Sequence, residues 1–254
     1  MPDPGPRPLV VLCEDRGAIV PSAAPGSLHP PESGRVHLWY APISSLRERI
    51  PHYADLLDPV EQDRMQRFRF EVDRDRFILG HGLLRTLLGR YLHRDASLIR
   101  MARGPFGKPY LERKSLRFNL SDTKDAVIIA FATELELGAD IETMTRDVDH
   151  RAVSEHYFTA TEIHGIGLAA DPKRRFLELW TRKEAVLKAS GVGIMEDLRV
   201  LRVDGPRNSM LIDHEAFVAL AAPQYHVRTW HVGGDHLVSL AAPEMLGEVD
   251  LFHA

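Results

Sequence analysis

The sequence predicts an α+β fold built from two similar lobes of helices and strands. Its 254 residues suit one large domain or two small ones of roughly 100–120 residues each. Apolar residues make up 44% of the chain, which allows a substantial core and excludes wholesale disorder. Helical and strand patterns occur in both halves, and this favours two lobes that each combine both kinds of structure.

The first elements are predicted from prolines, apolar runs and capping residues. Eight of the 17 prolines lie in residues 1–35, so this segment is expected to be an irregular arm with a short strand at Leu9–Cys13. The apolar run Val36–Ala41 predicts the strand that opens the folded body. Asp58 and Pro59 are typical of an N-cap and the first residue of a helix.

The middle of the chain predicts one long helix followed by strands. A helix is expected over Arg74–His93, because these apolar residues recur at helical spacing: Phe77, Leu84, Leu87, Leu88 and Tyr91. The segment GPFGKP at residues 104–109 is a turn. Three strands are expected after it: Arg117–Ser121, Ala126–Ala132 and Leu135–Glu142.

The last part of the chain predicts helices and then strands. The expected helices are Arg151–Tyr157, Thr161–Gly165 and Arg174–Ser190, the last ending at Gly191. The expected strands are Leu198–Val203, Ser209–Asp213, His226–His231 and His236–Ala241. Gly233 and Gly234 suit a hairpin turn between the last two.

Composition excludes several classes of protein. The single Cys13 excludes an internal disulfide framework and a cysteine-based zinc cage. The apolar runs are too short to span a bilayer, and the start of the chain lacks a secretory signal, so we expect a cytoplasmic protein without membrane contact.

Charge is distributed unevenly along the chain. The net charge is −4, yet the segment Arg64–Arg117 holds 14 Lys and Arg against 5 Asp and Glu. This basic block indicates either a local polyanion site or solvated helix faces, and a nucleic-acid surface is a third hypothesis.

Two carboxylates mark the strongest local pattern, GADIE at residues 138–142. On a strand Asp140 and Glu142 share one face, about 7 Å apart. Because their charges repel, a hard cation such as Mg²⁺ would stabilise them, although an exposed strand face would also tolerate them.

A second pattern lies on the predicted helix Arg174–Ser190. Glu184 and Lys188 are i,i+4 neighbours on the side of Trp180. Glu184 could be a third metal ligand or a base and Lys188 could lie near a phosphate, or the two could form an ordinary surface ion pair. Lys108, held between Gly107 and Pro109, is a reasonable phosphate contact.

Taken in order, GKP, FNLS, GxDIE and WxxKEAxxK resemble the Sfp-type 4′-phosphopantetheinyl transferases over residues 68–193. The resemblance implies a pseudo-twofold α+β fold, with coenzyme A and Mg²⁺ bound between two lobes. It implies a boundary near Glu134–Leu135, which gives an N-terminal lobe at 36–134 for the coenzyme A phosphates and a C-terminal lobe at 135–254 for metal and catalysis. It also implies a monomer that modifies a serine of an acyl, peptidyl or aryl carrier protein.

The resemblance also assigns roles to single residues. Asp140, Glu142 and Glu184 match the family's metal ligands, and Glu184 is also the residue that would activate the carrier serine. Lys188 matches a lysine beside the pyrophosphate. The remaining matches are contacts to coenzyme A: Lys108 and Ser121 at its nucleotide end, and Arg64 and Arg76 around its phosphates.

One position departs from the family pattern. Asp122 stands where the family has a histidine that meets the 3′-phosphate. A carboxylate there would repel the phosphate unless it turns away or Lys124 compensates. The alternative hypothesis is therefore a non-catalytic homologue that binds coenzyme A or a carrier protein with an impaired donor site. The carrier's pathway stays open among fatty-acid, polyketide and nonribosomal peptide synthesis.

Overall fold

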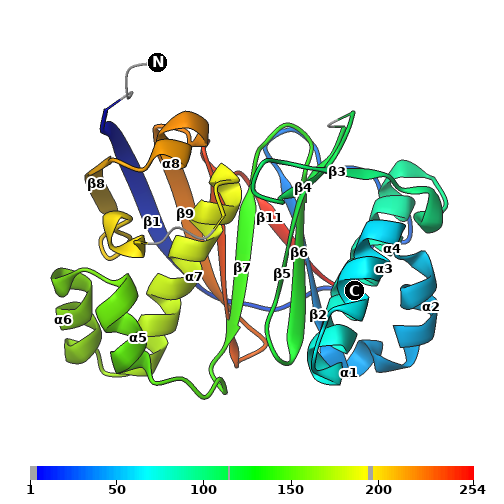
Figure 1. Ribbon diagram of the computed structural model, residues 1–254, viewed down its shortest axis with the longest axis horizontal. Helices are drawn as coiled ribbons and strands as arrows, with labels where there is room; N and C mark the ends of the chain where they lie inside the picture. Colours follow the sequence, from blue (N-terminus) through cyan, green and yellow to red (C-terminus); the bar gives the residue numbers. More distant parts are fainter. Residues whose placement is uncertain (1–4, 114, 194–196) are drawn as a thin grey trace.

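Two sheets pack face to face and helices cover the outer face of each, which gives four layers (Figure 1). The computed structural model describes residues 5–113, 115–193 and 197–254. The first sheet has the order β11-β2-β6-β5 and the second the order β7-β10-β9-β1-β8. Among the described residues, no helix combines the length and the apolar character needed to cross a membrane.

The first sheet and its helices occupy the right half of Figure 1. Its strands are β2 (Val36–Pro42), β5 (Arg117–Asp122), β6 (Ala126–Ala132) and β11 (Val249–His253). Its helices are α1 (Ile43–Leu46), α2 (Ile50–Leu56), α3 (Pro59–Gln66) and α4 (Glu71–Leu92). The hairpin β3 (Met101–Arg103) and β4 (Pro109–Leu111) follows α4.

The second sheet contains both early and late segments of the chain. Its strands are β1 (Arg7–Ile19), β7 (Gly138–Thr143), β8 (Arg207–Ile212), β9 (Gln224–Val232) and β10 (His236–Ala242). Its helices are α5 (His150–Tyr157), α6 (Ala160–Leu168), α7 (Pro172–Ser190) and α8 (Glu215–Leu220).

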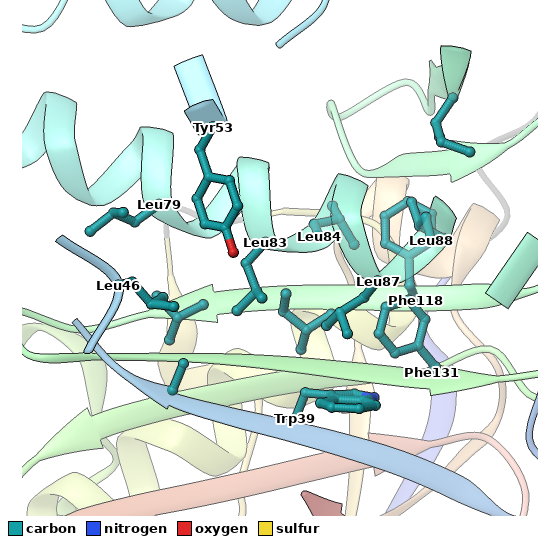
Figure 2. Packing of buried hydrophobic residues seen from close by; sticks show 14 of the residues in the cluster. Trp39, Leu46, Tyr53, Leu79, Leu83, Leu84, Leu87, Leu88, Phe118 and Phe131 are labelled. Carbon is teal, nitrogen blue, oxygen red and sulfur yellow. The ribbon is translucent and has the colours of Figure 1, made fainter. Parts of the chain in front are cut away.

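Strand β6 shows how the layers are built, because every one of its residues is buried. Val127, Ile129 and Phe131 point to the core beneath α4, where Trp39 and Leu84 also lie (Figure 2). The alternate residues Ala126, Ile128, Ala130 and Ala132 point to the core between the sheets. A strand buried on both faces reads as a continuous apolar run, which is why the sequence predicted it well.

Helix α7 lies directly on β7, and Gly138 makes this approach possible. A Cβ atom at Gly138 would lie 2.2 Å from the carbonyl oxygen of Ala185, far closer than any real contact. The helix therefore brings Glu184 and Lys188 against the face of β7 that carries its two carboxylates.

Most predicted elements are confirmed. The structure contains the strands at β2, β5, β6, β9 and β10, the long helices α4 and α7, and the Asp58 capping box. Gly191 ends α7 in the left-handed conformation, with φ of 76°. Gly233 and Gly234, both with positive φ, connect β9 to β10 as the expected hairpin.

Two predictions need correction, and one strand was not predicted. Residues 1–35 are not an irregular arm throughout, because β1 spans Arg7–Ile19 and pairs with β8 and β9 inside the second sheet. The expected strand Leu198–Val203 is wrong, since Leu198–Val200 form a 3-10 turn. Strand β11 was not predicted, and it joins the first sheet beside β2 although it ends the chain. The lobe boundary at residues 134/135 stays a prediction.

Candidate active site

The site lies where an edge strand of each sheet meets the other. Strand β7 is an edge of the second sheet, so some of its backbone N–H groups need partners from outside that sheet. The side chain of Asn119 accepts a hydrogen bond from Ala139 N at 2.8 Å, and Ser121 Oγ accepts one from Ile141 N at 3.4 Å. The polar residues of the FNLS segment thus join β5 of the first sheet to β7 of the second, while Phe118 and Leu120 pack under α4.

Asp140 is the centre of the site. Its Oδ1 accepts hydrogen bonds from Ser121 Oγ at 2.9 Å and from Lys188 Nζ at 2.6 Å. Its Oδ2 is buried and has no hydrogen-bond partner among the described residues. A buried carboxylate oxygen without a donor is costly, and a bound cation would remove that cost.

The other two carboxylates, Glu142 and Glu184, lie where burial and the charge of Asp140 disfavour their ionised forms. Burial, and then repulsion from Asp140, raise the pKa of Glu142 to about 7 although Arg146 pairs with it. Burial and Asp140 likewise raise the pKa of Glu184 to about 7, against the opposing charge of Lys188. Ionisation near neutral pH is typical of groups that bind a metal or move a proton.

These side chains face one cavity of about 460 Å³. Cations and carboxylates both line it, among them Arg64, Arg103, Asp140, Glu142, Glu184 and Lys188. A cavity lined by both signs suits a ligand that combines an anion with a divalent cation.

The chemistry of the donors fits a hard divalent cation, because all three carboxylates supply oxygen ligands. Asp140 Oδ2 is a ready ligand atom without a competing donor. However, no three His, Cys, Asp or Glu side chains form a ready-made metal cluster within the described part of the chain. Lys188 and Arg146 instead occupy the other oxygens of Asp140 and Glu142. A cation could reach Asp140 through Oδ2 while Lys188 stays in place, whereas at Glu142 it would compete with Arg146.

Lys108 does not line this cavity. Its Nζ donates to the carbonyl oxygens of Leu137 at 3.0 Å and Ala189 at 3.3 Å, and Glu136 lies 3.6 Å away. Burial lowers the pKa of Lys108, although Glu136 opposes this. Its ammonium group ties the GKP turn to the start of β7 and the end of α7, while the neighbours Gly107 and Pro109 line the cavity.

Arg64 and Arg76, the two arginines predicted to contact phosphates, differ in how far carboxylates already pair with their guanidinium groups. Arg64 lines the cavity, with its guanidinium 5.2 Å from the ring centre of Phe77. Arg76 instead donates to Asp73 at 2.9 Å and to Asp122 at 2.6 Å, so two carboxylates already share its charge. The basic block is therefore divided between ion pairs and the cavity.

The Arg76 contact also changes the interpretation of Asp122. Burial raises the pKa of Asp122, and the positive charges of Arg76, Lys188 and His81 oppose that rise. Lys124, the expected compensating residue, donates to the carbonyl oxygen of Thr145 at 2.7 Å instead. Arg76 is thus the cation that neutralises Asp122.

Three residues of the cavity wall were not identified from the sequence: His81, Arg103 and Arg146. Thr123, whose Oγ1 lies 3.3 Å from Glu142, was also not identified. Thr123 continues the alternation of Asn119 and Ser121 past the end of β5, a signal that could have been used. His81 and Arg146 carry no such local signal, because helix and loop residues reach the cavity only after folding.

Family models and known proteins match most of the chain. The family model described as the 4′-phosphopantetheinyl transferase superfamily matches residues 136–241, and the model of a 4′-phosphopantetheinyl transferase N-terminal region matches residues 44–134. The chain is 31% identical to the 4′-phosphopantetheinyl transferase HetI of Nostoc sp., over 66% of this chain and 74% of HetI.

Two further relatives cover more of the chain. A phosphopantetheinyl transferase of Thraustochytrium sp. is 30% identical over 85% of this chain and 79% of its own length. The 4′-phosphopantetheinyl transferase Sfp of Bacillus subtilis is 26% identical over 77% of this chain and 86% of its own length.

Proposed function

Because the chain belongs to the 4′-phosphopantetheinyl transferase superfamily, we propose that it moves the phosphopantetheine group of coenzyme A to a carrier-protein serine in an Mg²⁺-dependent reaction. The observation that carries this proposal is Asp140, a buried carboxylate with one oxygen unpartnered and the other held by Lys188. Acyl, peptidyl and aryl carrier proteins are the candidate acceptors.

Asp140, Glu142 and Glu184 would hold the metal ion. A bound Mg²⁺ would supply positive charge to the pyrophosphate and to the oxygen that leaves. Lys188 would donate to the same pyrophosphate, since three hydrogens on Nζ leave capacity beyond its contacts to Asp140 and Ser121.

In the reaction the serine oxygen of the carrier attacks the β-phosphorus of coenzyme A. The bond from that phosphorus to the bridging oxygen breaks, and 3′,5′-ADP leaves. Glu184 accepts the serine proton, directly or through one water. Its pKa of about 7 suits a general base at neutral pH. Most of the rate acceleration comes from positioning and from neutralisation of charge.

The proposal includes finer features of the protein. The two lobes are taken as a pseudo-twofold pair divided near residue 134. Lys108 and Ser121 are taken as contacts to the nucleotide end of coenzyme A, and Arg64 and Arg76 as contacts around its phosphates. We also propose a cytoplasmic monomer that needs no nucleic acid or membrane. Division of the basic block among internal ion pairs supports a small anion site over a nucleic-acid surface.

The test is an assay of the full chain with coenzyme A and purified apo-carrier proteins of the three kinds. Mass spectrometry should detect the gain of one phosphopantetheine group on a carrier when Mg²⁺ is present and not with EDTA. Glu184→Gln should retain coenzyme A binding in calorimetry and lose transfer. No modification of any carrier, with coenzyme A bound normally, would favour the non-catalytic alternative.

A further inference from the structure

His81 is a cavity residue whose contacts resemble those of a ligand-binding group. It lies on α4, is 8% exposed and lines the same cavity as Asp140 and Lys188. Its Nδ1 is 2.8 Å from Glu61 Oε1, and its ring lies on Phe77 with the ring centres 4.1 Å apart. Two independent contacts therefore fix the orientation of the imidazole.

The partner Glu61 determines which nitrogen carries a proton. Glu61 is fully buried and also accepts from Arg85 Nε at 2.6 Å. Burial opposes its ionisation, but the hydrogen bond and charge of His81 and the charge of Arg85 outweigh burial and lower the pKa of Glu61. Because an ionised carboxylate only accepts hydrogen bonds, Nδ1 of His81 must be the donor.

The other ring nitrogen is then the one that can serve a ligand. Nε2 of His81 makes no hydrogen bond within residues 5–113, 115–193 and 197–254. With Nδ1–H engaged by Glu61, an anionic ligand would be bound by a ring that also carries a proton on Nε2. The protonated ring would present one N–H donor to the cavity.

The surroundings of His81 fit a phosphate. Arg64 lines the cavity from the neighbouring helix α3, and Arg103 lines it from β3. Arg76 is occupied by Asp73 and Asp122, so it is a poor phosphate donor in this chain. Since the charge of Arg76 is shared with these two carboxylates, His81 together with Arg64 and Arg103 supplies the donors that remain for an anion on this side.

We propose that His81, held by Glu61, binds a phosphate group of the coenzyme A donor through Nε2–H. This inference rests on the proposed function. It gives a role in coenzyme A binding to a residue that lies outside the motifs GKP, FNLS, GxDIE and WxxKEAxxK. Two phosphate groups of coenzyme A share this chemistry, the 3′-phosphate and the pyrophosphate. Glu61 acts as a positioning residue that keeps Nδ1–H engaged.

The test compares His81→Asn with the wild-type chain by calorimetry, using coenzyme A and 3′-dephospho-coenzyme A. The shorter asparagine can keep the bond to Glu61 while it removes the donor at Nε2. Coenzyme A binding should weaken about tenfold, the usual effect of losing a hydrogen bond to a charged group. A smaller loss for the dephospho compound assigns the contact to the 3′-phosphate, and an equal loss assigns it to the pyrophosphate.

Two further variants separate binding from folding. His81→Gln places a neutral amide donor near the position of Nε2 and should retain part of the affinity. His164→Asn, an exposed histidine on α6, is the matched control and should bind like wild type. In the transfer assay His81→Asn should raise KM for coenzyme A about tenfold and leave kcat within about twofold, whereas general damage to the site would lower kcat.

The inference is overturned if all His81 variants bind both ligands within twofold of wild type. It is also overturned, in favour of a structural role, if both His81 variants lower kcat and thermal stability together. A wild-type chain that binds no coenzyme A would overturn the proposed function as well, so the two failures are distinguishable.

Discussion

Glu61 and Asp140 are both buried carboxylates beside cations, yet only Glu61 has donors for both of its oxygens. His81 serves one oxygen of Glu61, and Arg85 with the backbone N–H of Asp58 serves the other. Asp140 receives two donors on Oδ1 and none on Oδ2. The satisfied cluster stabilises the packing of α3 on α4, and the unsatisfied carboxylate is the one that we propose to bind a cation.

The pKa shifts of the carboxylates show the same difference between the cluster around Glu61 and the cluster around Asp140. The pKa of Glu61 is lowered because hydrogen bonds and charge exceed the effect of burial. The pKa values of Glu142 and Glu184 are raised to about 7 because burial and Asp140 exceed the effect of nearby cations. A protein carries such a cluster at a cost in stability, which is usual for functional sites.

The largest expected effect is on transfer, from Asp140→Asn. The variant keeps the size of the side chain and removes its charge, so the rate of transfer should fall about a thousandfold. The free energy of unfolding should change by less than about 1 kcal/mol, because relief of repulsion among three carboxylates offsets the weaker contact to Lys188. Mass spectrometry and urea unfolding without Mg²⁺ measure the two effects. A large loss of stability would contradict the contrast with Glu61.

Glu61→Gln should show the opposite pattern. It leaves the buried guanidinium of Arg85 with less compensating charge and should lower the free energy of unfolding by about 3 kcal/mol. Transfer measured at low temperature with saturating coenzyme A should persist, since Glu61 touches no reacting atom. Circular dichroism during urea unfolding gives the first value. An unchanged midpoint would show that the cluster is not a structural one.

The unsatisfied cluster should make stability depend on pH in a defined direction. Glu142 and Glu184 bind protons more tightly folded than unfolded, because their pKa values rise from 4.5 to about 7. Their contribution to stability is therefore lost as pH rises from about 4.5 to about 7, on the order of 3 kcal/mol for each group. Thermal unfolding at pH 5 and pH 8 measures this, and Mg²⁺ should restore stability at pH 8. A Glu142→Gln and Glu184→Gln double variant should show a smaller decline.

The smallest effect is expected from Arg146→Ala at the rim of the same cluster. Its side chain is 39% exposed where it pairs with Glu142, so the loss of stability should be below about 1 kcal/mol. Because Arg146 occupies an oxygen of Glu142, its removal should lower the Mg²⁺ concentration needed for half-maximal transfer by a few-fold. A titration of Mg²⁺ in the transfer assay would reveal the change, and a higher requirement would mean that Arg146 helps to bind the donor.

Local patterns explain what was predictable. Alternation along residues 135–142 located the faces of β7, and apolar spacing located α4 and α7. The strand at β1 was underestimated because prolines dominate its surroundings, and β11 was missed because its partner β2 lies more than 200 residues away in sequence. Pairing between distant strands has no local signature.

The sequence by itself determined the chemistry of the site, since helical and strand periodicity place Asp140, Glu142, Glu184 and Lys188 on definite faces. Only the tertiary structure decided how charges pair. It directs Lys108 to backbone carbonyls at the end of α7, gives Asp122 the guanidinium of Arg76, and brings His81 into the cavity. The reason is physical: a charge is stabilised by whichever opposite charge or dipole lies within a few ångströms, and folding sets those distances.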